Sequence, residues 1–424
     1  MTDQSFQRIS IIGLGYIGLP TAAMFASRKI NVIGVDVNAR AVSMINKGEI
    51  HIVEPDLDMV VQAAVQQGYL RATTTPEHAD AFLIAVPTPF KGEDHEPDLS
   101  YIEAAATAIA PVLQSGNLVI LESTSPVGAT QAMAGWLAAA RPDLTFPQTH
   151  GEASDIRIAH CPERVLPGKV MQELVTNDRV IGGMTPLCSQ RSAALYKTFV
   201  KGECVVASGP RVAEMAKLTE NSFRDVNIAF ANELSLISDK LDMDVWELIS
   251  LANRHPRVNI LQPGPGVGGH CIAVDPWFIV SSAPDTARLI RTAREVNDSK
   301  PEWVLAKIRE AIGAHLMAHP NQTAAQVTVA VYGLAFKPDI DDLRESPALE
   351  IARQLASDHT GPLLVVEPNI DALPYGLQDA QLATFTEAAA AAVHVMLVDH
   401  KSFKTAPVPT SAIVDVRGVW AKSG

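Results

Sequence analysis

Cys271 stands in the stretch GPGVGGHCIAVDP, residues 264–276, which holds four glycines and two prolines. Glycine gives up side-chain packing, so the backbone can bend and approach another group closely. Cysteine is a strong nucleophile once deprotonated, and a thiol of ordinary pKa ~8.5 becomes reactive when a neighbouring cation lowers that pKa. The alternative is a buried, apolar thiol in a structural loop. We interpret the stretch as an active-site loop whose glycines admit a substrate to Cys271.

Asp275 follows Cys271 by four residues and allows two interpretations. Its carboxylate could orient or activate a water molecule near the thiol. The pair Asp275-Pro276 is also typical of the N-cap and first residue of a helix. The two roles are compatible, so both stand as expectations. We interpret the neighbouring His270 as structural.

The stretch GLGYIG supplies Gly13, Gly15 and Gly18 in the spacing G-x-G-x-x-G, between a predicted strand and a predicted helix. In such a motif the first glycine makes the turn, the second lets a pyrophosphate approach, and the third lets helix and strand pack closely. Asp36 ends the next predicted strand, where a carboxylate binds the ribose diol of NAD. Because Arg40 lies just beyond Asp36, NADP remains an alternative to NAD as the cofactor. A second alternative is a glycine-rich turn that binds no cofactor. The pattern predicts an NAD site.

A nucleophilic thiol and a hydride acceptor in one chain suggest a particular reaction. The thiol would capture an aldehyde as a thiohemiacetal, and loss of hydride from this adduct would give a thioester. Hydrolysis of the thioester would then release an acid.

Further polar residues allow both a functional and a structural interpretation. Thr88 and Thr124 follow predicted strands at the edge where ligands of parallel sheets gather, but turns around neighbouring prolines explain them equally well. Lys217, Asn221 and Arg224 form one row of a predicted helix, which is either functional or a solvated face.

A loop near the C-terminal end, AFKPDIDDLRESP at 335–347, carries Lys337 and Arg344. We expect Arg344 to open a helix capped by Asp341 or Asp342. Basic side chains here suit contacts with phosphate or carboxamide groups, and a solvated loop is the alternative.

The predicted strands and helices around these residues follow a simple order along the chain. Strand and helix patterns alternate up to about residue 205. Residues 211–254 contain neither Gly nor Pro, and their periodicity predicts a long helix followed by a second helix. Strands and helices alternate again after residue 318. The predicted fold is α/β, with two Rossmann-like, doubly wound parallel-sheet domains joined by a central helical domain. We expect domains at 1–205, 206–318 and 319–424.

Composition excludes several classes of protein. The 424 residues are 47% hydrophobic, and the N-terminus lacks the pattern of a signal peptide. No stretch of ~18 apolar residues predicts a membrane helix, and the four cysteines include no CxxC pair, which argues against a disulfide framework and a metal site. The net charge of −13 disfavours nucleic acid and anionic membranes as partners. We expect a soluble, cytoplasmic protein in which clustered Lys and Arg hold any anionic ligand.

Seven blocks, in order along nearly the whole chain, resemble the UDP-glucose/GDP-mannose dehydrogenase family. They are IIGLGYIGLPTA, AVPTPF, ILESTSPVG, CPERVLPG, KLTENSFRDVNIAFANE, NRHPRVNILQPGPGVGGHCIAVDPWF and GLAFKPDIDDLRES. The resemblance implies two Rossmann-like domains, a central helix that forms a homodimer interface, and NAD and a UDP-sugar as ligands.

The resemblance also assigns roles to individual residues. Cys271 matches the family's nucleophile, Lys217 its acid/base and oxyanion-stabilising lysine, and Thr124 the threonine that holds a water. The other matched catalytic positions are Asn221, Asp275 and Glu163. The positions expected to contact NAD are Tyr16, Ile17, Asp36, Thr88 and Arg344. The positions expected to hold the nucleotide sugar are Arg164, Val165, Arg224, His255, Arg257, Gly268, Phe336 and Lys337, together with Lys217 and Asn221.

One departure from the family's sequence pattern narrows the choice of substrate. UDP-glucose enzymes of the family continue the PE element with Phe-Leu and a second glutamate, whereas this chain has Pro167 at the position of that acid. The resemblance therefore implies oxidation of the C6 hydroxyl of a UDP-N-acetylhexosamine, first UDP-N-acetyl-D-mannosamine, to the carboxylate for bacterial surface polysaccharide. The alternatives are UDP-N-acetylglucosamine or another UDP-hexose as substrate, a hydroxyacid-type dehydrogenase that stops after one hydride, and a non-catalytic UDP-sugar sensor.

Overall fold

The computed structural model describes residues 6–92, 95–269 and 271–420. The chain forms two compact units. The N-terminal unit comprises residues 1–220 and 281–284, and the C-terminal unit comprises residues 221–280 and 285–424. Within the described ranges, no helix combines the length and the apolar character needed to cross a membrane.

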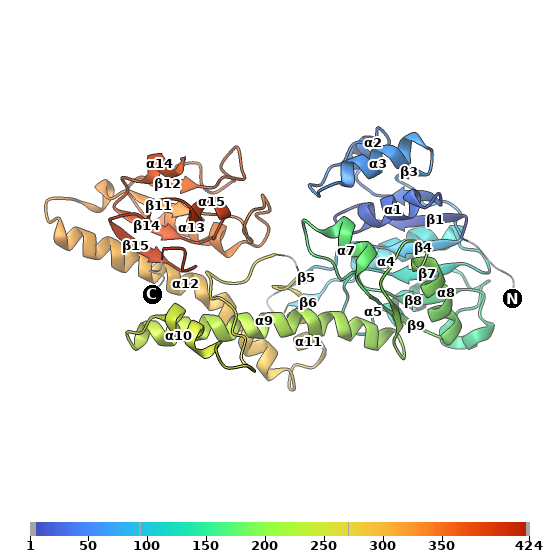
Figure 1. Cartoon of the computed structure of the whole chain (residues 1–424). Helices are drawn as coiled ribbons and strands as arrows, with labels where there is room; N and C mark the ends of the chain where they lie inside the picture. The colour runs from blue at the N-terminus through green and yellow to red at the C-terminus, as the bar shows by residue number, and fades with distance from the viewer. Residues whose placement is uncertain (1–5, 93–94, 270, 421–424) are drawn as a thin grey trace. The chain divides into compact units, whose positions relative to one another are not determined.

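An eight-stranded sheet forms the centre of the N-terminal unit, in the order β10-β9-β8-β7-β4-β1-β2-β3 (Figure 1). Neighbouring strands are parallel except β8 and β9, which are antiparallel. The strands of this unit, including the small hairpin β5–β6, are β1 Arg8–Ile12, β2 Asn31–Val35, β3 Leu70–Thr73, β4 Ala81–Ile84, β5 Phe90–Lys91, β6 Glu96–Pro97, β7 Leu118–Leu121, β8 Arg157–His160, β9 Arg179–Gly183 and β10 Cys204–Val206.

Helices cover both faces of this sheet because its strands are apolar on both sides. Ile11 and Leu83 belong to one buried cluster, which includes residues of α1, α3, α7 and α8. Ile12 and Ile84 belong to the other, with α4 and α5. The helices are α1 Gly18–Ser27, α2 Ala39–Ile45, α3 Leu57–Gln66, α4 Ser100–Ile109, η1 Ala110–Val112, α5 Ala129–Ala140, α6 Pro147–His150, η2 Gly151–Ala153, α7 Val170–Thr176 and α8 Pro186–Tyr196.

The central helices agree with the predicted plan. Residues 210–240 form one helix, α9 Pro210–Lys240, and the boundary between the two units falls within it. Asp244 caps α10 Val245–Ala252 by accepting hydrogen bonds from two backbone N–H groups. The helices α11 Asp275–Ser282 and α12 Arg288–Ala318 follow.

The C-terminal unit holds a second, fully parallel sheet in the order β13-β12-β11-β14-β15. Val329 and Val331 face a cluster with α12 and α13, and Tyr332 faces a second cluster with α14 and α15. The predicted α/β class with two Rossmann-like sheets is therefore confirmed. The remaining elements are β11 Val329–Tyr332, β12 Leu363–Val366, β13 Gln381–Leu382, β14 Val393–Met396, β15 Ala412–Asp415, η3 Ala324–Gln326, α13 Pro347–Asp358, α14 Phe385–Ala388 and α15 Lys401–Lys404.

Three local expectations are wrong. The N-terminal sheet is not wholly parallel, because β9 returns beside β8 in the opposite direction. Arg344 does not open a helix: α13 begins at Pro347, and Ser346 caps it by accepting from the N–H of Leu349 at 3.3 Å. Asp275 is itself the first residue of α11 rather than the residue before it.

Candidate active site

The glycine motif of the N-terminal unit has a turn, a close packing contact and an open approach. Gly13 has φ +91°, and a Cβ there would lie 2.5 Å from the carbonyl oxygen of Ala85. A Cβ on Gly18 would lie 1.8 Å from the carbonyl oxygen of Gly13, so only glycine fits at both positions. Around Gly15, no atom of the described residues lies within 4 Å of a built Cβ, apart from Gly15 itself and its two chain neighbours. A pyrophosphate therefore has room to approach the backbone just before α1.

Asp36 lies beside this turn. It follows β2 and is partly exposed, and its Oδ2 accepts a hydrogen bond from the N–H of Leu14 at 2.9 Å. Its Oδ1 accepts from the N–H of Asn38 at 2.8 Å. The exposed Arg40 lies in the first turn of α2. Tyr16 and Ile17, immediately before α1, are partly buried.

Thr88 and Thr124 meet, as expected for residues after neighbouring strands. β4 and β7 are parallel partners, and the Thr88 hydroxyl donates to the carbonyl oxygen of Thr124 at 2.5 Å. Thr124 is partly exposed, whereas its neighbours Ser123 and Ser125 are buried. The Thr124 side chain thus lies at the carboxyl edge of the sheet, where cofactors of this fold bind.

Glu163 and Lys217 form a buried ion pair. Glu163 follows β8 and is 6% exposed, Lys217 lies in α9 and is 7% exposed, and Lys217 Nζ is 3.3 Å from Glu163 Oε1. The N–H of Val165 donates to Glu163 Oε2 at 2.9 Å, which fixes the carboxylate further. Lys217 is therefore not part of a solvated helix face, because a buried charge needs a close partner and this one has it.

Glu214 is a residue that the sequence analysis missed. It is fully buried and accepts hydrogen bonds from the N–H of Gly128, the N–H of Thr130 and the hydroxyl of Thr130, at 2.7, 2.8 and 2.6 Å. It thereby caps α5, whose own N-cap Gly128 has no side chain to do so. Because Lys217 lies less than one helical turn after Glu214, this clamp also fixes the position of Lys217. The signal was an acidic residue among apolar ones at the start of a helix.

A second buried charge cluster contains Glu122, Arg179 and Tyr196. Glu122 Oε1 accepts from the Tyr196 hydroxyl at 3.2 Å and from Arg179 Nη1 at 3.4 Å. Burial raises the pKa of Glu122 to about 6, although Arg179 opposes this. Burial also raises the pKa of the Cys161 thiol to about 12, which makes that cysteine inert at neutral pH.

In the C-terminal unit, Cys271 and Asp275 are one turn apart. The N–H of Asp275 donates to the carbonyl oxygen of Cys271 at 2.8 Å, so Cys271 begins the turn that leads into α11. Asp275 is 3% exposed, and its Oδ2 accepts from Asn221 Nδ2 at 2.5 Å. The structure thus joins Asn221 and Asp275, two predicted site residues that are far apart in the sequence. Cys271 is partly exposed, and His270 lies outside the described residues.

The glycines before Cys271 pack tightly rather than leaving an open loop. A Cβ on Gly268 would lie 2.6 Å from the carbonyl oxygen of Glu345 and 2.7 Å from Cβ of Phe336. A Cβ on Gly269 would lie 3.0 Å from the Phe336 ring, at φ +82°, and one on Gly266 would lie 3.1 Å from Pro347. The glycines therefore allow close approach of the Phe336 and Pro347 loops of their own unit, which the sequence analysis did not predict.

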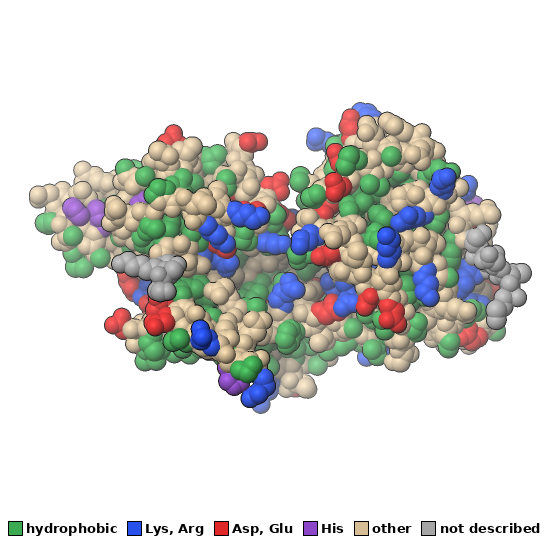
Figure 2. All heavy atoms as spheres, in the orientation of Figure 1, with side chains coloured by type: hydrophobic (Ala, Val, Ile, Leu, Met, Phe, Trp, Pro, Cys, Tyr) green, Lys and Arg blue, Asp and Glu red, His purple; other side chains and the backbone are tan. Residues whose placement is uncertain are grey.

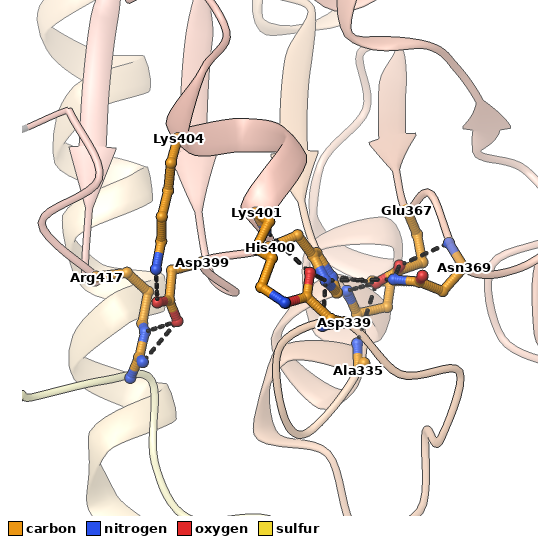
Figure 3. A network of polar contacts seen from close by, with 10 residues as sticks. Ala335, Asp339, Glu367, Asn369, Asp399, His400, Lys401, Lys404 and Arg417 are labelled. Atoms are coloured by element: carbon orange, nitrogen blue, oxygen red, sulfur yellow. Dashed lines mark hydrogen bonds and ion pairs between the residues drawn. The ribbon is translucent and has the colours of Figure 1, made fainter. Parts of the chain in front are cut away.

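Arg417 and Asp399, which the sequence analysis also missed, hold the start of this glycine loop. Arg417 donates to the carbonyl oxygen of Pro263 at 3.2 Å and to Asp399 Oδ1 at 2.6 and 3.0 Å. Figure 3 shows Lys404 on the same carboxylate, at 2.8 Å. Asp399 follows β14 and Arg417 follows β15. Their places at the carboxyl edge of adjacent parallel strands were the available signal.

The other predicted substrate residues differ in their surroundings. Arg164 pairs with Glu220 at 2.8 Å in the N-terminal unit, where Val165 packs on the core. Arg344, which is a predicted NAD contact rather than a substrate residue, has its Nη2 2.5 Å from Asp342 Oδ2. The exposed residues of the set are Arg224, His255 and Arg257, and Lys337 is partly buried. On the face drawn in Figure 2, basic and acidic side chains are interspersed, so a net charge of −13 leaves local basic surface for an anion.

Three family models match the chain in order. Residues 7–200 match the NAD binding domain of the UDP-glucose/GDP-mannose dehydrogenase family, residues 211–299 its central domain, and residues 330–422 its UDP binding domain.

Individual relatives agree with these matches. The chain is 67% identical over 423 residues to UDP-N-acetyl-D-mannosamine dehydrogenase of Yersinia pestis, covering 98% of this chain and 100% of that protein. It is 61% identical over 420 residues to NDP-N-acetyl-D-galactosaminuronic acid dehydrogenase of Ralstonia solanacearum, covering 98% and 97%. The solved structure of UDP-D-ManNAc dehydrogenase from Pyrococcus horikoshii superposes with a TM-score of 0.86 at 37% identity, covering 98% of this chain and 96% of that one. The chain therefore belongs to the UDP-glucose/GDP-mannose dehydrogenase family and is an NAD-dependent oxidoreductase.

Proposed function

We propose that this protein oxidises the C6 hydroxyl of UDP-N-acetyl-D-mannosamine to the carboxylate, with two NAD per sugar, for bacterial surface polysaccharide. Its relatives at 66–67% identity over 98% of the chain are UDP-N-acetyl-D-mannosamine dehydrogenases. The geometric observation that carries the proposal is Cys271 in the turn that leads into α11, with Asp275 held by Asn221 at 2.5 Å. We further propose that the enzyme works in the cytoplasm, where NAD and nucleotide sugars are available.

The first oxidation requires a base for the C6 hydroxyl. We assign this role to Lys217 in its neutral form, or to a water held by Glu163 and Thr124. Lys217 Nζ and Glu163 Oε1 are 3.3 Å apart, so the two groups lie close enough to share this task. NAD, when bound along Gly13, Gly15 and Gly18, supplies the acceptor for each hydride. The alcohol loses one proton and one hydride, and the product is an aldehyde.

The second oxidation uses Cys271. Its sulfur forms a bond to the aldehyde carbon, the carbonyl oxygen becomes a thiohemiacetal oxygen, and loss of a second hydride gives a thioester. Water then attacks the thioester carbon, the C–S bond breaks, and the carboxylate and the free thiol are released. Asp275 orients or activates this water, and Lys217 stabilises the oxyanions. In sum, one sugar alcohol, two NAD+ and one water give one uronate, two NADH and three protons.

The tight packing of Gly268 and Gly269 on Phe336 supports a substrate role for this loop pair. Because the Phe336–Lys337 segment contacts the glycines next to Cys271, a nucleotide held by Phe336 and Lys337 would be fixed relative to the thiol. Arg164, Val165, Arg224, His255, Arg257 and Gly268 complete the proposed sugar-nucleotide set, and Arg344 and Asp36 the proposed NAD contacts.

We also propose the domain division 1–205, 206–318 and 319–424, and a homodimer that forms through α9. Phe223, Phe230 and Ile237 recur at seven-residue spacing on α9 and are 71, 52 and 45% exposed. A row of large apolar side chains at this spacing suits packing against the same helix of a second copy.

The test is product analysis with UDP-N-acetyl-D-mannosamine and excess NAD. We expect two NADH per sugar and a uronate product. The Cys271→Ser variant should lose acid formation and stop at the aldehyde level. One NADH per sugar would instead indicate the hydroxyacid type of dehydrogenase, and tight UDP binding without any NAD reduction would indicate a sensor.

The exact sugar needs a panel of substrates. A relative at 61% identity is named for N-acetyl-D-galactosaminuronic acid, so another NDP-N-acetylhexosamine is the second candidate. UDP-N-acetylglucosamine, UDP-N-acetylgalactosamine and UDP-glucose should each give a kcat/KM at least about tenfold below that of UDP-N-acetyl-D-mannosamine, the size of discrimination one or two contacts provide. A higher value for any of them would replace the proposed substrate.

A further inference from the structure

His400 holds the segment that carries Phe336 and Lys337. It is fully buried, and its Nδ1 lies 2.9 Å from the backbone N of Asp339 and 3.2 Å from Asn369 Nδ2. Its Nε2 lies 3.0 Å from Glu367 Oε2. Figure 3 shows His400 between the Asp339 segment and the Glu367–Asn369 turn.

These contacts fix the tautomer of His400. A backbone N–H can only donate, so the Nδ1 that receives it from Asp339 must carry a lone pair. The proton is therefore on Nε2 and is donated to Glu367, which is 4% exposed. Glu367 has no other orientation open to it, because Oε2 also accepts from the N–H of Leu334 at 2.8 Å and Oε1 accepts from the N–H of Asn369 at 3.1 Å.

The Asp339 end of the contact sets a strained backbone. Asp339 has φ +63°, an uncommon conformation for a residue other than glycine. Its Oδ1 accepts from the N–H of Lys401 at 2.9 Å, and its Oδ2 lies 3.5 Å from Lys401 Nζ. The hydrogen bond with Lys401 is the main reason why the pKa of Asp339 is lowered. Two consecutive residues, His400 and Lys401, thus hold both the backbone and the side chain of Asp339.

The segment that His400 and Lys401 hold also packs against the loop of Cys271. Phe336, three residues before Asp339, would lie 2.7 Å from a Cβ on Gly268 and 3.0 Å from one on Gly269. Gly269 is two residues from Cys271. A shift of the 336–339 segment would therefore move a side chain against which the Cys271 loop is packed without spare room.

We propose that His400 is a positioning residue for nucleotide-sugar binding: as a neutral acceptor for the Asp339 N–H, it holds the 336–339 segment in its binding conformation. The inference rests on the proposed function, since Phe336 and Lys337 are proposed nucleotide-sugar residues. The role assigned to His400 involves no contact of its own with substrate or cofactor.

Two variants separate the two sides of the imidazole. In His400→Asn the amide oxygen can occupy the place of Nδ1 and accept from Asp339, while the contact with Glu367 is lost. In His400→Gln the amide nitrogen can occupy the place of Nε2 and donate to Glu367, while the acceptor for Asp339 is lost. Each variant removes one hydrogen bond, so a general loss of stability should affect both alike.

The measurements are UDP binding by titration calorimetry, KM and kcat with UDP-N-acetyl-D-mannosamine, KM for NAD, and the unfolding midpoint. We expect His400→Gln to weaken UDP binding and raise the sugar KM about tenfold, the effect of one hydrogen bond. His400→Asn should stay within about twofold of the wild type. Both variants should keep the KM for NAD and show similar unfolding midpoints. Equal UDP affinity in the two variants would overturn the proposal.

A measurement on the unaltered protein guards against variants that do not fold. Nitrogen NMR of His400 should show a proton on Nε2 and none on Nδ1 at neutral pH, and a proton on Nδ1 would overturn the proposal. If the wild-type protein bound no UDP at all, the proposed function would fail and this inference with it. If it bound UDP and His400→Gln bound it as well, only the inference would fail.

Discussion

The two Rossmann-like sheets share one contact and use it differently. In the N-terminal unit, Asp36 follows the second strand and accepts from the N–H of Leu14 at 2.9 Å. In the C-terminal unit, Glu367 follows β12 and accepts from the N–H of Leu334 at 2.8 Å. Asp36 is partly exposed, whereas Glu367 is 4% exposed and also accepts from Ala335 and His400.

The exposure of the acid decides which kind of site the shared topology provides. A partly exposed carboxylate beside an open Gly15 can receive a ribose diol. Glu367 cannot, because its oxygens are used inside the protein and Ala335, in place of the second glycine, is 1% exposed. The C-terminal unit therefore keeps the acid as a fastening for its loops, in agreement with its match to a UDP binding domain.

Gly18→Val should have the largest effect. The new Cβ would lie 1.8 Å from the Gly13 carbonyl oxygen, so α1 must move away from β1. We expect a loss of about 3 kcal/mol or more in the free energy of unfolding, and no NAD binding in any protein that folds. The matched control is Ala335→Gly at the corresponding loop of the C-terminal unit, which should leave NAD binding unchanged. Denaturant unfolding and NAD titration measure both, and normal NAD affinity in Gly18→Val would contradict the comparison.

Asp36→Ala and Glu367→Gln should have opposite signatures. Asp36→Ala should weaken NAD binding roughly ten- to hundredfold, because it removes a charged hydrogen-bond acceptor, with a smaller effect on stability. Glu367→Gln should leave NAD binding unchanged and lower the free energy of unfolding by about 2 kcal/mol, since buried donors lose part of their acceptor. NAD titration and thermal unfolding of both variants decide this. A loss of NAD affinity in Glu367→Gln would show that the two acids do not have separate roles.

The last prediction concerns pH, because the pKa shifts of buried glutamates in the two units have opposite signs. Burial raises the pKa of Glu122 in the N-terminal unit to about 6, from 4.5. For Glu367 burial also opposes ionisation, but hydrogen bonds from His400 and the Leu334 N–H outweigh it and lower the pKa. A carboxyl group whose pKa is higher in the folded than in the unfolded protein stabilises the fold when the pH is below its unfolded pKa. This stabilisation is lost as the pH rises through its folded pKa. A carboxyl group whose pKa is lower in the folded protein stabilises the fold when the pH is above its unfolded pKa. This stabilisation is lost as the pH falls through its folded pKa.

Glu122→Gln removes the first of these contributions. Relative to the wild type, the variant should gain roughly 2 kcal/mol in free energy of unfolding between pH 4.5 and pH 7, from about 1.4 kcal/mol per pKa unit. Denaturant unfolding across this pH range measures it. A pH-independent difference between variant and wild type would contradict the assignment of a raised pKa to Glu122.

The sequence predicted the elements that have strong local signals. The long helix over 210–240, the strands of both sheets that read as apolar runs, and the GLGYIG turn follow from periodicity and from glycine's conformational freedom. The short strand β10 and the antiparallel β9 lacked such a signal, because pairing direction depends on where the chain returns in space. The cap of α13 was misplaced because Asp341, Asp342 and Ser346 are all acceptable N-caps, and packing selected Ser346.

Residue type and spacing predicted a dinucleotide turn at Gly13–Gly18 and a reactive thiol at Cys271, but they left the row of Lys217 and Asn221 open between a functional and a solvated face. The three-dimensional fold was needed to show that Lys217 pairs with Glu163 and Asn221 with Asp275, and that the glycines near Cys271 pack on Phe336. The physical reason is range. Backbone conformation and helical faces depend on neighbours a few residues away, whereas burial of a charge or a tautomer of His400 depends on groups tens of residues away in the chain.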